Sequence, residues 1–209
     1  LMSPDANKGK GYSPTYLRTL NNQLTAILNH AARYYGLNPN PAVRTMKMGS
    51  KDTKEMSFWT KEEYLKFSDA MMDSPRLFVI FEVLYWTGIR EGELLALKPD
   101  SFDWGRNTMR IDKSYQRFGG RDVITDPKFL AETIRDYLSK NPQIGPSERM
   151  CPVSKSLLSR AMEKGSKKAG VKRIRIHDLR HSHVSLLIDM GFSAVAIADR
   201  MGHESSDIT

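Results

Sequence analysis

The sequence is poor in cysteine: Cys151 is the only one among 209 residues. A single cysteine excludes an internal disulfide and a zinc site built from cysteines, and it indicates a reducing compartment. No apolar run approaches the ~18 residues of a membrane-spanning helix. The first residues also lack the basic and then apolar pattern of a secretory leader. We therefore expect a cytoplasmic protein that contains no membrane segment.

Acidic residues are outnumbered by basic ones, with 24 Asp and Glu against 32 Lys and Arg, which gives a formal net charge of +8. Such an excess is typical of an ordinary basic surface or of a protein that binds nucleic acid, and charge alone does not separate the two. The hydrophobic content of 40% and the charged content of 27% are those of a globular protein with a core.

The first long helix is predicted from Pro14 to Tyr35, with Ser13 as its N-cap and Gly36 closing it. Its apolar residues recur at helical spacing, so the helix needs a surface to pack against. Too few residues precede it to form that surface. Residues 37–57 are rich in proline and in basic side chains. We interpret them as a linker and place a domain boundary between residues 55 and 56.

The rest of the chain is predicted to be mainly helical, with a small antiparallel β-sheet. Apolar spacing and helix punctuation predict helices at about 61–72, 75–87, 91–97, 129–139, 155–169, 178–190 and 193–201. Alternating residues bounded by turns predict strands at 108–114 and 122–125.

The segment from Ile176 to His183 is unusually rich in histidine, and it also carries Arg180. His177 and Arg180 are three residues apart, so on a helix they share one face. A guanidinium repels a metal cation, but it clamps the oxygens of a phosphate while a histidine transfers a proton. The segment therefore predicts a phosphate site. His181 and His183 are more typical of supporting residues.

Three motifs follow one another at long separation. They are Thr87-Gly88-Ile89-Arg90-Glu91-Gly92-Glu93-Leu94, His177-Asp178-Leu179-Arg180-His181 and Met201-Gly202-His203-Glu204. This series resembles the catalytic domain of the tyrosine recombinases, or phage-type integrases, and is most similar to integrases of conjugative transposons. The resemblance covers residues 56–209. The helix that starts at Pro14 resembles the last part of the family's core-binding domain, so residues 1–55 are expected to be a partial core-binding domain and linker.

The resemblance implies a site-specific recombinase that integrates and excises a mobile element. A tyrosine hydroxyl attacks a DNA phosphodiester, and the 3′-phosphotyrosine keeps the bond energy, so neither ATP nor a metal or other cofactor is expected. Arg90 and Arg180 would stabilise the charge on the phosphate. His177 would be the acid/base histidine, and His203 would hydrogen-bond the scissile phosphate.

Two parts of the family's pattern are missing here. The family's lysine, which protonates the leaving oxygen, matches Lys128 best and Lys113 less well, but Phe129 starts a helix where the family has a return strand. The nucleophilic tyrosine of the family lies beyond the position of Thr209. We therefore expect the chain as given to bind DNA without cleaving it.

The expected partner is double-stranded DNA, on which the protein would assemble as a homo-oligomer. In the part that resembles the core-binding domain, the candidate DNA contacts are Lys10, Tyr12, Asn21 and Asn22. In the basic run before His177, they are Lys172, Arg173 and Arg175.

Three other functions stay open. A non-catalytic DNA-binding regulator of the same fold could dispense with Arg90 and Arg180, so their joint presence counts against it. A type IB topoisomerase-like enzyme uses similar residues, but the long first helix and the integrase-like sequence of residues 87–97 argue against it. A metal-dependent hydrolase would need carboxylate ligands, and only Asp178 and Glu204 lie near the histidines.

Overall fold

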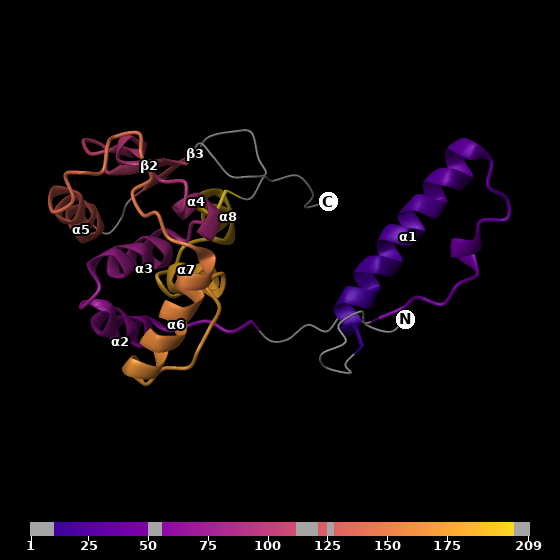
Figure 1. Cartoon of the computed structure of the whole chain (residues 1–209), viewed down its shortest axis with the longest axis horizontal. Helices are drawn as coiled ribbons and strands as arrows, with labels where there is room; N and C mark the ends of the chain where they lie inside the picture. Colours follow the sequence, from indigo (N-terminus) through magenta and orange to yellow (C-terminus); the bar gives the residue numbers. More distant parts are fainter. Residues whose placement is uncertain (1–10, 50–55, 112–120, 125–127, 203–209) are drawn as a thin grey trace. The chain divides into compact units, whose positions relative to one another are not determined.

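The computed structural model describes residues 11–49, 56–111, 121–124 and 128–202. These residues form two compact units, Leu1–Glu55 and Met56–Thr209, and each is described by itself (Figure 1). Among the described residues, no helix is both long and apolar enough to cross a membrane.

The first unit is built on one long helix, α1 (Pro14–Tyr35). The Ser13 hydroxyl accepts a hydrogen bond from the Tyr16 backbone N–H at 3.2 Å, and Gly36 ends the helix in the left-handed conformation with φ 69°. Both caps were predicted from the sequence. A short 3₁₀ helix, η1 (Pro41–Val43), follows. No residue of α1 is buried, although the helix carries several large apolar side chains.

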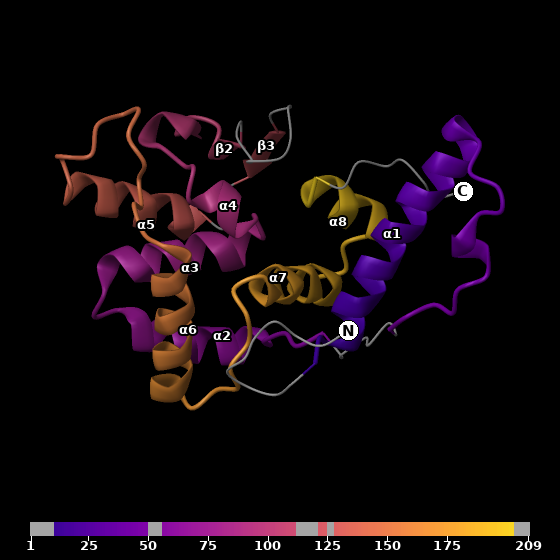
Figure 2. The ribbon, with the colours of Figure 1, turned by 45° about the vertical axis from the view of Figure 1, so that its right-hand side comes forward.

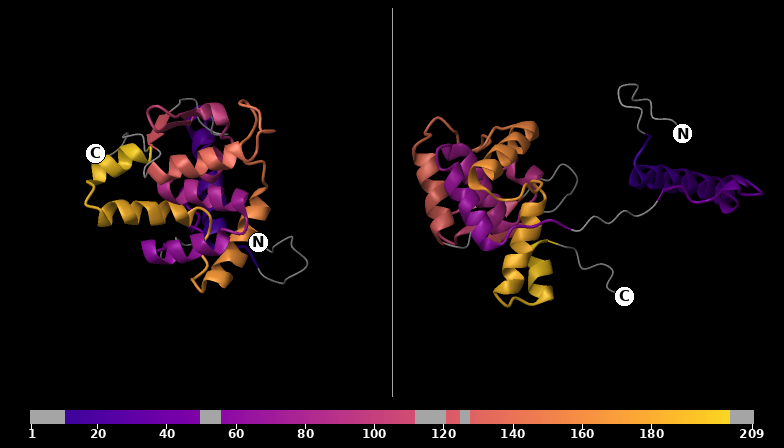
Figure 3. Two further views of the ribbon diagram at one scale, coloured as in Figure 1. Left: turned by 90° about the vertical axis from the view of Figure 1, so that its left-hand side faces the viewer. Right: turned by 90° about the horizontal axis from the view of Figure 1, so that it is seen from below.

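Helix α3 lies at the centre of the second unit, and α2, α5 and α7 pack against it. In the left view of Figure 3, α2, α3 and α5 stack as successive layers. Figure 2 shows α6 crossing α2, against which it packs. The helices of this unit are α2 (Lys61–Met71), α3 (Pro75–Thr87), α4 (Glu91–Leu94), α5 (Lys128–Ser139), α6 (Lys155–Ala169), α7 (Asp178–Asp189) and α8 (Ala194–Arg200).

A buried carboxylate joins α2 to α3. Glu82 is only 4% exposed. It accepts hydrogen bonds from the Tyr64 hydroxyl at 2.7 Å, the Ser68 hydroxyl at 2.6 Å and the Trp86 indole at 3.0 Å. Tyr64 also stacks on Tyr85. A buried charge is tolerated only when its acceptor positions are satisfied, so these three donors fix the C-terminal half of α3, the end that leads into the candidate site.

The antiparallel sheet has three strands in the order β1 (Phe102–Asp103), β2 (Thr108–Ile111) and β3 (Arg121–Ile124). A 3₁₀ turn, η2 (Pro99–Ser101), precedes it. The predicted strand at 108–114 is described as far as Ile111. Lys113 lies outside the described residues. After β3 the next described element is α5, which starts at Lys128, so no return strand follows β3 in the part of the chain that the structure describes.

Candidate active site and nucleic-acid interface

Arg90 lies three residues after the end of α3, at the N-cap of α4. Its guanidinium donates to Glu93 Oε1 at 3.0 Å, and its backbone N–H donates to Glu93 Oε2 at 2.9 Å. The Glu93 side chain is 2% exposed, whereas that of Arg90 is 35% exposed. A buried carboxylate that accepts both bonds holds the arginine in one orientation while part of the arginine side chain reaches the surface.

Arg180 lies in the first turn of α7 and is 6% exposed. Its Nη1 donates to the Gly88 carbonyl and its Nη2 to the Met201 carbonyl, each at 2.6 Å. One guanidinium thus joins the end of α3, helix α7 and the end of α8. One residue, Ile89, separates Gly88 from Arg90, so their Cα atoms are at most about 7 Å apart along the chain. The structure therefore brings the first two sequence motifs together.

The turn between α3 and α4 depends on Gly88. Its φ is 63°, a left-handed conformation that favours glycine. A Cβ at this position would lie 2.6 Å from Cδ2 of His183 and 2.9 Å from Cε of Met201. Glycine therefore allows the chain to turn and also lets α7 and α8 approach it closely.

His177 forms the N-cap of α7 and its side chain is exposed. Its ring meets the ring of His181 edge to face, with 5.2 Å between the centroids. Desolvation by neighbouring atoms lowers the pKa of His177 below the ordinary histidine value, and the charges of His181 and Arg180 lower it further. A neutral imidazole at neutral pH is able to accept a proton.

The predicted basic contacts ahead of His177 lie on the surface, and each has an acidic partner. Lys172 pairs with Glu63 at 3.6 Å, and Arg173 with Glu163 at 3.7 Å. Pairs this exposed contribute little stability, so a phosphate can compete for the cation.

Arg175 is held more tightly than Lys172 and Arg173. Its Nε and Nη2 donate to the carboxylate of Asp178, which is 2% exposed, with a shortest distance of 2.7 Å. Burial alone would raise the pKa of Asp178, but the hydrogen bonds from Arg175 outweigh it and the pKa lies below the ordinary value. Asp178 therefore remains ionised and keeps the exposed guanidinium beside His177.

Lys128 is exposed and is the first residue of α5. Its neighbour Phe129 packs edge to face on Trp86, near the end of α3, with 5.3 Å between the ring centroids. This contact brings the start of α5 close to the segment that carries Arg90.

The other candidate residues lie outside the described part of the second unit. His203 and Lys10 lie outside the described residues. Tyr12, Asn21 and Asn22 belong to the first unit, where Tyr12 packs against the ring of Tyr16.

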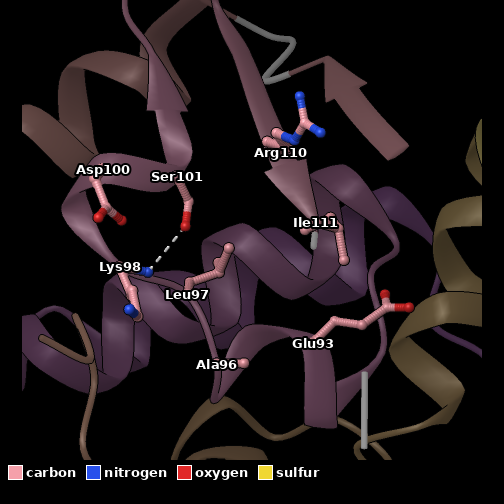
Figure 4. A pocket seen from close by; sticks show the side chains of 8 residues that line it. All are labelled: Glu93, Ala96, Leu97, Lys98, Asp100, Ser101, Arg110 and Ile111. Atoms are coloured by element: carbon pink, nitrogen blue, oxygen red, sulfur yellow. Dashed lines mark hydrogen bonds between the residues drawn. The ribbon is translucent and has the colours of Figure 1, made fainter. Parts of the chain in front are cut away.

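A shallow pocket of about 290 Å³ lies between α4, η2 and β2. Its charged side chains point in different directions, with Arg110 and Glu93 turned away from one another (Figure 4). The pocket therefore offers no convergent set of groups for a ligand. Nor do three metal-ligating side chains gather anywhere among the described residues.

Gly88 and Glu93 hold residues of the candidate site, and neither contact was predicted from the sequence. Both lie inside the first motif. The spacing from Arg90 to Glu93 is that of a capping box, which was the available signal for Glu93. The role of the Gly88 carbonyl depends on Arg180, 92 residues away, and no local pattern shows it.

The sequence model of the phage integrase family matches residues 57–209. The chain belongs to the phage integrase family. Among its relatives, the ICEBs1 integrase of Bacillus subtilis (strain 168) is 28% identical over 95% of this chain and 61% of its own length. The integrase of Mycobacterium phage D29 is 27% identical over 95% of this chain and 58% of its own length. The chain thus spans about three fifths of these integrases.

Solved structures share the integrase fold. A Tn1549 transposon integrase in complex with transposon right end DNA matches with a TM-score of 0.75 and 18% identity, over 95% of this chain and 74% of its own. A lambda integrase dimer bound to a COC′ core site matches with a TM-score of 0.71 and 20% identity, over 93% and 58%. The mainly helical architecture with a small antiparallel sheet is therefore that of tyrosine recombinase catalytic domains, as the sequence predicted.

Proposed function

We propose that the protein is a site-specific DNA recombinase that cuts and rejoins DNA through a 3′-phosphotyrosine to integrate and excise a mobile element. The observation that carries the proposal is the Arg180 guanidinium, whose bonds to the carbonyls of Gly88 and Met201 unite the segments of all three motifs. Residues 1–55 would be part of a core-binding domain, and residues 56–209 the catalytic domain.

In the proposed reaction, a phosphodiester is attacked in line and negative charge accumulates on its non-bridging oxygens. Arg90 and Arg180 are anchored before DNA arrives, so they stabilise this charge without reorganising. His177, which is neutral at neutral pH, would take a proton from the attacking hydroxyl. Lys128 would protonate the leaving oxygen, and His203 would add a hydrogen bond to the phosphate.

Double-stranded DNA is the proposed partner, bound by a homo-oligomer. The solved relatives include a Tn1549 integrase with transposon end DNA, a lambda integrase dimer on a core site and a lambda integrase tetramer on a Holliday junction. The exposed cations Lys172, Arg173 and Arg175 would contact the backbone beside the cleavage site. Because the proposed substrate is DNA and the single cysteine indicates a reducing compartment, the cytoplasm is the compartment we propose.

Replacing Arg90 tests the proposal directly. Arg90→Lys leaves a positive charge beside Glu93 but removes the planar, bidentate guanidinium. In the full-length protein, we expect the covalent adduct with a nicked duplex of the element end to form at least about 100-fold more slowly. The DNA dissociation constant should change little, because many other phosphate contacts remain.

The matched control is Arg106→Lys. Arg106 also pairs with an acid three residues away, Asp103 at 3.7 Å, but its side chain is 80% exposed and lies in the turn between β1 and β2. This change should leave adduct formation at the wild-type rate. Equal rates for Arg90→Lys and the wild type would contradict a catalytic role for Arg90 and would favour a DNA-binding regulator of the same fold.

A further inference from the structure

The segment through which the chain enters the second unit is fixed to the candidate site by Trp59. This side chain is fully buried. The Trp59 backbone N–H donates to the Ser182 hydroxyl at 2.9 Å, and its indole N–H donates to the Lys172 carbonyl at 2.7 Å. Trp59, which precedes α2, is thus hydrogen-bonded to two residues that lie more than a hundred positions further along the chain.

Ser182 completes the first of these connections. It is 1% exposed and lies on α7, two residues after Arg180. Its hydroxyl donates to the Asp178 carbonyl at 3.0 Å while it accepts the bond from Trp59. The hydroxyl therefore uses both its donor and an acceptor position, and it ties the first turn of α7 to the entry segment.

Lys172 provides the second connection, on the other side of His177. Besides its carbonyl bond to Trp59, its ammonium lies 5.7 Å from the ring centre of Phe58 and 3.6 Å from Glu63. The segment from Lys172 to Ser182 is thus attached to the entry segment at both ends. His177 lies midway between these two attachments, and Arg180 lies next to the second.

We propose that Trp59 and Ser182 are positioning residues, which set His177 and Arg180 in register for the reaction. Both are buried, so they act through the backbone of α7 and of the loop before it rather than by contact with DNA. The inference rests on the proposed recombinase function and assigns roles to residues outside its three motifs. Its physical basis is that displacement of a catalytic group by about 1 Å can slow a reaction about 100-fold.

The chain contains a matched control for Ser182. Ser166 is 2% exposed and donates from its hydroxyl to the Met162 carbonyl at 2.7 Å, which is the same bond four residues back, but within α6. Removing the Ser182 hydroxyl also leaves the buried Trp59 N–H without its acceptor, so the thermal unfolding midpoint should fall further for Ser182→Ala than for Ser166→Ala. Only the removal of Ser182 should affect the geometry around His177.

The test compares Ser182→Ala and Ser166→Ala in the full-length protein. Three quantities are measured: the single-turnover rate of adduct formation, the DNA dissociation constant and the thermal midpoint. We expect Ser182→Ala to form the adduct about tenfold more slowly with an unchanged dissociation constant, and Ser166→Ala to react at the wild-type rate. Trp59→Phe, which removes the indole bond to Lys172 together with part of the buried ring, should also slow the reaction.

Equal reaction rates for the two serine variants would overturn the inference, because the Ser182 bond would then serve stability alone. If Ser182→Ala does not fold, the rate of adduct formation by Trp59→Phe is the deciding measurement. If Trp59→Phe then reacts as fast as the wild type, the inference is overturned. A wild-type protein that forms no adduct would instead contradict the proposed function, so the two failures are distinguishable.

Discussion

His177 lies beside a second imidazole and a buried guanidinium, and both disfavour its protonated form. Desolvation lowers its pKa most, followed by the charges of His181 and Arg180, while Asp178 acts in the opposite direction. A lowered pKa leaves the ring more often neutral than an ordinary histidine, which is half protonated at a pH of about 6.5. As a base, His177 should therefore work below that pH.

A pH–rate profile of adduct formation tests this charge state. The acid limb should lie below pH 6.5, the ordinary histidine value. His181→Ala removes a like charge and uncovers His177, and both effects raise the pKa of His177, so the limb should move to higher pH. His30→Ala, in α1 of the first unit, is the control and should leave the limb in place. An acid limb that is unaffected by His181→Ala would argue against this account of His177.

Individual site residues were predictable to different degrees. His177 and Arg180 were found because three-residue spacing on a helix is a local property of the sequence. The partners that hold them were not found, because Gly88, Met201 and Trp59 approach α7 only through tertiary packing. The catalytic roles of all five candidates stay predictions: Arg90, Lys128, His177, Arg180 and His203.

At the scale of whole elements, the junction of α3, α7 and α8 depends on the close approach at Gly88. Gly88→Ala would force an alanine into the left-handed region, at a cost of about 1–2 kcal/mol. It would also push the new methyl group against His183 and Met201. We expect a loss in the free energy of unfolding that exceeds the backbone cost, measured by chemical denaturation.

Gly170→Ala separates the two contributions. Gly170 ends α6 with φ 66°, close to the 63° of Gly88, but a Cβ there would meet no atom within 4 Å. The control therefore has the backbone strain without the clash. If both variants lose the same free energy of unfolding, the close packing of α7 and α8 on Gly88 would not be supported.

Helices were the most predictable elements, because their caps are encoded locally. Gly36, which was predicted to end α1, adopts a left-handed conformation, as do the glycines after α3 and α6. A capping box joins Thr60 and Glu63 at the start of α2. Strand β1 was missed because it has two residues, too few for any alternation to appear. Helix α4 ends at Leu94, three residues earlier than expected. The backbone hydrogen bonds that follow, from Ala96 to Glu93 and from Leu97 to Leu94, span three residues instead of four.

At the scale of the whole molecule, the chain divides into units Leu1–Glu55 and Met56–Thr209, and the family match begins at residue 57. The catalytic fold was predictable from three ordered motifs, because their order and separation are specific even where identity to relatives is low. A role of the first unit in DNA binding stays a prediction, and α1 buries no residue from which such a role could be argued.

The central claim is that protein cations, and no metal, support cleavage at a phosphotyrosine. The most direct measurement is the formation of a covalent protein–DNA adduct by the full-length protein on a nicked element-end duplex in excess EDTA. We predict the same yield with and without EDTA, and a tyrosine-linked 3′-phosphate in the adduct by mass spectrometry. Loss of the adduct in EDTA, with recovery on adding Mg²⁺ or Zn²⁺, would contradict the account and point to a metal-dependent enzyme.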